Sequence, residues 1–181
     1  MAPVAECFTL QRAYYPATYD PIVLAHARAL LTSSEAGATE YIDADLRDTS
    51  KILAQASQLL DFSQPVAVTL IAILHAIPDS DDPHAIVATL MDAVPSGSYL
   101  AVSHMGSDLI PPQTQREMSD IGSRMSQQQI SNRSREQVSR FFAGTDLVEP
   151  GLVRVEEWRP EPGGTGVTGT SALWGAVGLK R

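Results

Sequence analysis

Residues able to contact a ligand follow the two most apolar stretches of the sequence. Leu74 and His75 close the run Val66 to Leu74, and His104 comes directly after the run Tyr99 to Ser103. Runs this continuously hydrophobic are typical of strands buried on both faces of a parallel sheet. Ligands of such sheets bind beyond the carboxyl ends of the strands. The pattern therefore predicts a small-molecule site beside Leu74, His75 and His104.

A carboxylate stands at the end of a third, shorter stretch. Glu40 to Asp45 has the pattern of a short strand, so Asp45 would lie at the same edge as the histidines. The plainer interpretation of Asp45 is a helix cap or a turn residue. Asp43 is expected to face away. His75 has a plainer interpretation too, as a structural histidine, and its alternative role is that of a general base.

Two further patterns suggest chemistry that we do not expect. Asp79, Asp81 and Asp82 resemble a metal cluster in composition, but Asp82-Pro83 is an ordinary helix start that also suits the helix dipole, so no metal is predicted. Glycines at 164, 166 and 169 spell GxGxxG, yet RPEPG precedes them and a strand-like stretch follows, so the dinucleotide signature lacks its strand and helix. A small basic patch is interpreted as a solvated face; it consists of Arg133, Arg135 and Arg140.

The elements expected around these residues alternate in the order αβαβαβ. They are a helix from Asp20 to about Ser33, a strand Glu40–Asp45, a helix Thr49–Leu60, a strand Val66–Leu74, a helix from Asp82-Pro83 to before Pro95, and a strand Tyr99–Ser103. A further helix opens at Ser134, where Gln137 can complete a capping box, and ends at Gly144. Two last strands, 147–158 and 171–179, would form an antiparallel hairpin at the sheet edge.

Composition limits the class of protein. The 181 residues fit one domain, and 44% of them are hydrophobic. The net charge of -8 argues against binding to nucleic acid or to an anionic membrane, because both need a positive field. Cys7 is the only cysteine, which favours a reducing compartment, and no apolar stretch is long enough to span a bilayer. We expect a cytoplasmic protein that binds a small molecule.

Four separated segments together resemble a bacterial family of S-adenosylmethionine-dependent methyltransferases. They are YDPIVLAHARALL, YIDADLRD, the stretch from LLDFSQPVAV to LAVSH, and RSREQVSRFFAGTDLVEPGLVRVEEWRP, and the resemblance covers residues 19–181. It implies an α/β fold with a Rossmann-like, doubly wound, mostly parallel sheet that ends in an antiparallel hairpin. It also implies S-adenosyl-L-methionine as the cofactor and a small-molecule methyl acceptor. The implied cofactor contacts are Asp20, Asp45, Leu46, Leu74 and His75, with Asp45 accepting a hydrogen bond from the adenine amino group.

The sequence departs from that family before Tyr19. Members carry a first strand that leads into a glycine-rich turn of the type DIGTGLP, and this sequence holds no such turn. The acidic residue that would hold the ribose hydroxyls falls on Thr18. Residues 1–18 are therefore expected to be an atypical segment, from a changed reading frame or a misplaced start, ahead of a partial transferase domain at 19–181. Either the edge of Val66–Leu74 stays unpaired or a strand within Cys7–Tyr15 replaces the missing one.

Two functions follow from this. The first is methyl transfer from S-adenosylmethionine to a small acceptor, with no catalytic residue identified. The second is a degenerate or truncated relative that lacks transfer activity, and the missing glycine turn and Thr18 favour it.

Overall fold

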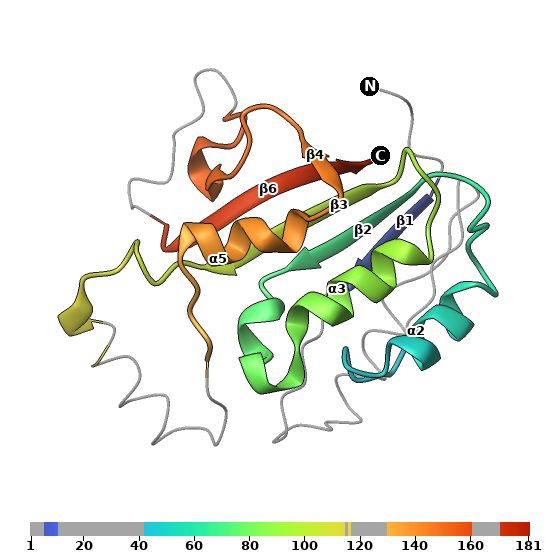
Figure 1. Ribbon diagram of the computed structural model, residues 1–181, viewed down its shortest axis with the longest axis horizontal. Helices are drawn as coiled ribbons and strands as arrows, with labels where there is room; N and C mark the ends of the chain where they lie inside the picture. The colour runs from blue at the N-terminus through green and yellow to red at the C-terminus, as the bar shows by residue number, and fades with distance from the viewer. Residues whose placement is uncertain (1–5, 11–41, 115, 117–129, 161–170) are drawn as a thin grey trace, which may run out of the picture.

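The protein is an open sheet with helices packed on it (Figure 1). The computed structural model describes residues 6–10, 42–114, 116, 130–160 and 171–181. The strands are β1 (Glu6–Leu10), β2 (Val66–Ile71), β3 (Tyr99–Met105), β4 (Thr145–Leu147), β5 (Val153–Arg154) and β6 (Leu173–Lys180). The α-helices are α2 (Thr49–Ala56), α3 (Pro83–Asp92) and α5 (Arg135–Ser139). Short 3₁₀ turns are η1 (Leu74–Ala76), η2 (Asp79–Asp81), η3 (Arg140–Phe142) and η4 (Val155–Glu157).

The sheet combines a parallel half with an antiparallel half. Its strand order is β1-β2-β3-β6-β4, and β5 pairs with β6 beside this path. The pairs β1·β2 and β2·β3 are parallel, whereas β6 runs antiparallel to β3, β4 and β5. The expected α/β, Rossmann-like fold class is thereby confirmed. The edge of β2 is not left unpaired, because β1 pairs with it in parallel over all five residues of β1.

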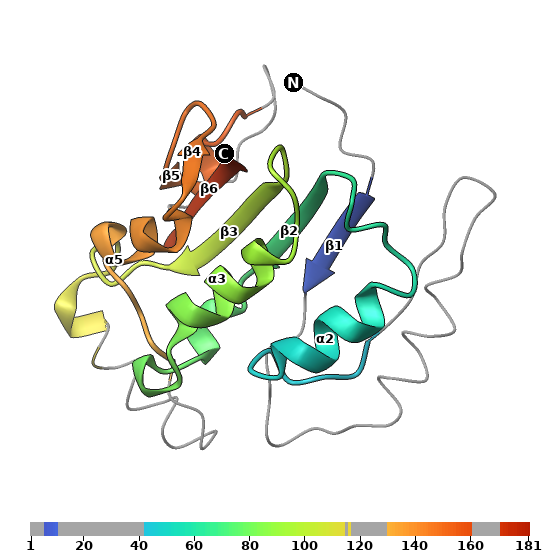
Figure 2. The same cartoon turned by 45° about the vertical axis from the view of Figure 1, so that its right-hand side comes forward.

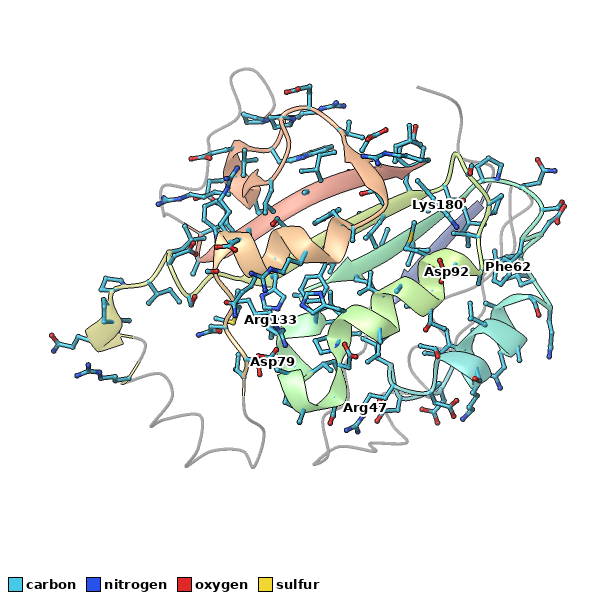
Figure 3. The ribbon with its side chains drawn as sticks, in the orientation of Figure 1. Arg47, Phe62, Asp79, Asp92, Arg133 and Lys180 are labelled. Atoms are coloured by element: carbon cyan, nitrogen blue, oxygen red, sulfur yellow. The ribbon has the colours of Figure 1, made fainter. Side chains whose placement is uncertain are left out.

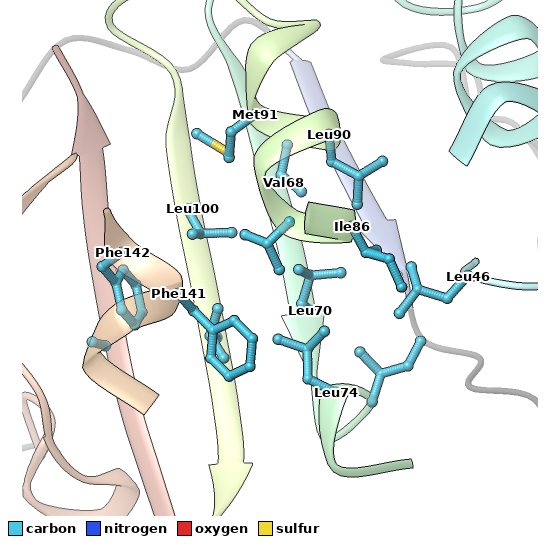
Figure 4. Close-up of a cluster of buried hydrophobic side chains, with 14 of the residues drawn as sticks. Leu46, Val68, Leu70, Leu74, Ile86, Leu90, Met91, Leu100, Phe141 and Phe142 are labelled. Atoms are coloured by element: carbon cyan, nitrogen blue, oxygen red, sulfur yellow. The ribbon is translucent and has the colours of Figure 1, made fainter. Parts of the chain in front are cut away.

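One face of the sheet carries α2, α3 and α5, which lie side by side in both views (Figures 1 and 2). The alternation along β2 puts Val66, Val68 and Leu70 under α3. Leu100 of β3 joins them (Figure 4). Helix α3 packs on this layer through apolar residues that recur every three to four positions; they are Pro83, Ile86, Val87, Leu90 and Met91. This core fixes the ends of β2 and β3 relative to the helices.

The helix starts follow the capping residues that the sequence offers. Asp48 caps α2 by accepting the Lys51 amide at 3.0 Å, and Asp82 caps α3 by accepting the Ala85 amide at 3.1 Å. Ser134 and Gln137 form the expected capping box at α5. The helix expected at 49–60 is shorter than predicted, because α2 ends at Ala56 and the chain continues in turns.

Three expected strands differ from the structure. β2 ends at Ile71, since Ala72 has a positive φ of 52° and turns the chain, and Leu74 and His75 therefore lie in η1 rather than at a strand end. Residues 42–45 form no strand. The single strand expected at 147–158 is two short ones, β4 and β5, because Pro150 has no amide hydrogen and Gly151, with φ 86°, closes a turn onto Val148. Both short strands pair antiparallel with β6, as the hairpin prediction required.

Some of the sequence predictions concern residues outside the described ranges. The helix from Asp20 to Ser33 and the glycines 164, 166 and 169 are among them. Among the residues that the structure describes, no helix has the length and apolar character needed to cross a bilayer.

Candidate functional site

The site lies where β2 and β3 end. Figure 3 shows Arg133, Asp79 and Arg47 at the end of the sheet toward which the β2 and β3 arrows point, and Lys180 at the other end. The turn that follows β2 is tied to β3, because the Ala72 amide donates to the Ser103 hydroxyl at 2.9 Å and to the Ser103 carbonyl at 3.2 Å. The polar residues after β2 therefore have a fixed position relative to β3.

Asp45 is present at this edge, and its carboxylate is already engaged. Its Oδ1 accepts from the Arg47 amide and from Arg47 Nε, both at 2.9 Å, and its Oδ2 accepts from Arg47 Nη2 at 2.6 Å. Arg47 Nη1 reaches across to Asp81 Oδ2 at 2.8 Å. These bonds from Arg47 lower the pKa of Asp45, so the carboxylate is ionised at neutral pH. Arg47 thereby joins the loop of Asp45 to the turn η2.

Leu46 and Leu74 are buried together, at 1% and 0% exposure (Figure 4). Both belong to the cluster of apolar side chains that includes Ile86 of α3. Their burial places the backbone of the Asp45–Arg47 loop and the backbone of η1 over the same part of the core. Asp43 makes a different contact, since its carbonyl oxygen accepts from Lys51 Nζ at 2.8 Å.

His75 is half-buried and is held by its backbone. The carbonyl oxygen of His75 accepts from the Ser131 amide at 2.8 Å, and its ring lies edge-on to the ring of His104, with 5.8 Å between centroids. The buried Nδ1 of His75 has no hydrogen-bond partner within the described structure. Burial and, to a smaller extent, the charge of Arg133 lower the pKa of His75, so the ring is neutral at pH 7.

Arg133 is buried, so the prediction that it lies on a solvated face is wrong. It is 2% exposed. Its Nη1 donates to the Leu74 carbonyl at 3.0 Å and to His104 Nε2 at 2.8 Å, and its Nη2 donates to the Ile77 carbonyl at 2.9 Å. Nη2 and Nε also donate to Asp79 Oδ1, at 2.6 and 3.1 Å. The N–H groups of this guanidinium therefore have acceptors in β3 and in the loop that follows β2.

The hydrogen bonds around His104 define its tautomer. Because Arg133 can only donate, His104 Nε2 is the acceptor, and the protonated Nδ1 donates to the Met105 carbonyl at 2.9 Å. Full burial lowers the pKa of His104 to about 4. Phe141 stacks on the His104 ring at 5.8 Å and on the His84 ring at 4.3 Å. His104 is thus a neutral core residue and does not face a ligand.

The three aspartates after β2 have separate structural partners. Asp79 pairs with Arg133, Asp81 pairs with Arg47, and Asp82 caps α3. The Arg133 bonds lower the pKa of Asp79. No group of three or more histidine, cysteine, aspartate or glutamate residues is placed to hold a metal ion in the part of the chain that the structure describes.

Gly106, directly after β3, has room for no side chain. A Cβ added there would come within 2.8 Å of the Leu109 side chain and of Trp174 Nε1. Trp174 cannot easily give way, because Nε1 donates to Asp108 Oδ1 at 2.7 Å. We expect Gly106→Ala to lower the free energy of unfolding by about 1–3 kcal/mol, the usual cost of overpacking. Denaturant unfolding followed by tryptophan fluorescence measures it, and an unchanged midpoint would contradict the close packing.

The residues predicted from the sequence therefore fall into three groups. Asp45, Leu46, Leu74 and His75 gather at one edge of the sheet, His104 lies beneath them, and Asp20 is outside the described residues. Arg47 and Arg133 were not predicted. The spacing Asp45-x-Arg47 is a local signal for the first, because a two-residue separation allows an arginine to fold back on an aspartate in a turn. Arg133 offers no such signal, since its partners lie 29 to 59 residues away.

Several solved structures are similar to this chain in both sequence and fold. A DUF574 family protein from Streptomyces avermitilis MA-4680 is 33% identical with a TM-score of 0.82, over 99% of this chain and 67% of the other. A candidate methyltransferase from Thermobifida fusca YX is 31% identical with a TM-score of 0.73, over 90% and 60%. The chain thus spans about two thirds or less of these relatives. A SAM-dependent methyltransferase from Anabaena variabilis, 10% identical with a TM-score of 0.55, shares the fold.

No curated protein matches this chain. A family model does, and its description is S-adenosyl methyltransferase. The match runs over residues 11–181 and so includes every strand and helix described above except β1. The chain belongs to the S-adenosyl methyltransferase family.

Proposed function

We propose that this chain transfers a methyl group from S-adenosylmethionine to a small acceptor and holds the adenosine half of the cofactor at the edge formed by Asp45 and η1. One observation carries the proposal most directly. The ionised Asp45 carboxylate and the Leu74-His75 turn lie at the same end of the sheet, linked through Arg47 and Asp81. This is the end at which open α/β sheets bind their ligands.

The residues at this edge fit an adenosine group. Among the described residues, Asp45 Oδ2 accepts one hydrogen bond, from Arg47, and a carboxylate oxygen has a second lone pair that can accept from the adenine amino group. The Leu46 backbone lies next to it, and the half-buried His75 would contact the cofactor from the side of β2, with the fully buried Leu74 supporting His75 from the core. By resemblance Asp20 completes the set.

The chemistry expected of the protein is mainly positioning. S-adenosylmethionine, when bound, supplies a methyl group on a sulfonium centre that leaves readily. The chain has to orient the two reactants and exclude water. His75 is neutral at pH 7, which is the protonation state that a general base requires. This role is an alternative to a purely structural one for His75.

The acceptor is proposed to be a small molecule. The net charge of -8 supports a neutral or cationic acceptor over a nucleic acid, which would be repelled. The single cysteine supports a reducing compartment such as the cytoplasm.

A second candidate is a relative of these enzymes that has lost transfer activity. The sequence feature that supports it is the lack of a DIGTGLP-like turn, because only glycine lets the backbone approach the amino-acid half of the cofactor so closely. Calorimetry with S-adenosylmethionine and S-adenosylhomocysteine separates the two candidates. Binding in the micromolar range supports the enzyme, and no heat at millimolar ligand supports the inactive relative.

Asp45→Asn tests the site itself. The substitution removes a charged acceptor from the adenine amino group, and we expect the affinity for S-adenosylhomocysteine to fall by about tenfold or more. Isothermal calorimetry of the folded variant gives the dissociation constant.

Asp43→Asn is the matched control, because it makes the same change of charge two residues away. Its affinity should stay within about twofold of the original, a change worth little free energy. Equal losses in both variants would place the adenine elsewhere.

A further inference from the structure

The buried side chain of Arg133 connects the segment that starts at residue 130 to the proposed cofactor edge. The Arg133 side chain is 2% exposed. Its guanidinium donates hydrogen bonds to the carbonyl oxygens of Leu74 and Ile77, which both belong to the loop that follows β2. The Arg133 backbone joins the end of β3, because its amide donates to the Met105 carbonyl at 3.1 Å and its carbonyl accepts from Ser107 at 3.0 Å. Arg133 is therefore bonded at once to the loops after both strands.

Close packing of the core does not by itself require a charged side chain at position 133. Removing a guanidinium from water costs several kcal/mol, and apolar residues of similar volume often replace buried ion pairs without loss of stability. An arginine does add directional hydrogen bonding, because the five N–H groups of its planar guanidinium hold several acceptors in one fixed arrangement. Here the acceptors are two backbone carbonyls, the His104 ring and the Asp79 carboxylate.

A second arginine, Arg47, also binds the loop that follows β2. Arg133 holds Asp79, the first residue of η2, and Arg47 holds Asp81, the last residue of η2. Arg47 in turn holds the carboxylate of Asp45. The turn η2 is thus bonded to an arginine at each end. Through η2 and Arg47, Arg133 is connected to Asp45, the acceptor proposed for the adenine amino group.

We infer that Arg133 is a positioning residue for the cofactor edge. It holds the loop Leu74–Asp81 in the orientation that presents His75 to the ligand and keeps Arg47 and Asp45 in place through η2. Arg133 does not touch the ligand, and it acts through the residues that do. The inference rests on the proposed function, since it assumes that the adenosine half binds at this edge.

Two neighbouring arginines make a matched comparison. Arg135 resembles Arg133, which lies over the Phe141 ring, in that its guanidinium bonds a backbone carbonyl, at Leu152, and lies over an aromatic ring, at Trp174, but Arg135 is exposed. Its bonds go to the carboxyl-terminal half of the chain and not to the loop after β2. Lysine at either position keeps the charge and the aliphatic stem but loses the planar fork. A purely structural role of Arg133 predicts that a folded Arg133→Lys variant loses stability but keeps its affinity for the ligand, whereas a positioning role predicts that the affinity itself falls.

The experiment measures S-adenosylhomocysteine affinity by calorimetry in the full-length chain and its variants, each first shown to be folded by amide NMR spectra. We expect Arg133→Lys to weaken binding by about tenfold and Arg135→Lys by less than about twofold. If Arg133→Lys binds as tightly as Arg135→Lys does, charge and packing at Arg133 suffice and the inference is overturned.

A second pair of variants avoids the core, in case Arg133→Lys does not fold. Asp79 is exposed, and Asp79→Asn removes only the negative charge with which Asp79 pairs with Arg133 and joins it to η2. Asp146→Asn is its control, because Asp146 pairs with Arg181 on exposed β4. We expect Asp79→Asn to weaken binding about threefold and Asp146→Asn to leave it unchanged, a difference that calorimetry resolves. Equal affinities would overturn the inference, whereas absence of binding by the original chain would overturn the proposed function first.

Discussion

Arg133→Met is expected to lower the free energy of unfolding by about 3 kcal/mol, because it leaves buried acceptors without donors. The Ile77 carbonyl and His104 Nε2 lose a charged donor, while the Leu74 carbonyl keeps the Ile77 amide at 3.1 Å. Relief of the buried charge offsets part of the loss. Urea unfolding followed by circular dichroism measures the change.

Arg140→Met is the control for this experiment. Arg140 forms an exposed pair with Glu136, and such pairs contribute only about 0.5 kcal/mol. If both methionine variants unfold at the same urea concentration, the guanidinium of Arg133 does not organise the ends of β2 and β3.

Stability is expected to fall steeply as the pH is lowered from 6.5 toward 4, because His104 is buried in its neutral form. In this interval the unfolded chain binds a proton at His104 and the folded chain does not, so stability rises with pH. The contribution is complete above the ordinary pKa of 6.5 and is lost by about pH 4. A shift of this size corresponds to about 3 kcal/mol. His75 and His84, whose pKa values are also lowered, add in the same direction.

His104→Gln isolates the effect of that one ring. Glutamine places an oxygen where Nε2 accepts from Arg133, but it does not titrate. The variant should lose the part of the pH dependence that His104 causes, even if its stability at neutral pH is lower. Urea unfolding at pH 7, 6, 5 and about 4 gives the slope. An equal slope in the two proteins would mean that His104 is not a buried neutral group.

Local sequence signals identified the regular elements well where caps and apolar spacing agree. Asp82-Pro83 started α3, and Ser134 with Gln137 started α5, because each motif satisfies the free amides of a first turn within four residues. The strand after Pro65 was predicted three residues too long. Its apolar pattern continues to Leu74, but the backbone turns at Ala72, and hydrophobicity alone does not reveal such a turn.

The candidate site was predictable only in part, for a physical reason. Asp45, Leu46, Leu74 and His75 follow apolar segments, so topology alone brings them to one edge of the sheet. Arg133 looked like a surface residue, because a charged side chain is rarely buried and nothing next to it compensates its charge. Its acceptors come from Leu74, Ile77 and His104, which are close only once the sheet has formed.

The proposed function depends most on one placement, that of the adenosine half of the cofactor over the Asp45–Arg47 loop and η1. Amide NMR spectra of the chain, recorded while S-adenosylhomocysteine is added, test it directly. We predict that the amide signals of Leu46 and His75 shift together and saturate at one ligand concentration, while those of Asp146 at the far edge stay in place. Saturating shifts that leave out both Leu46 and His75, or no shifts at all, would contradict the account.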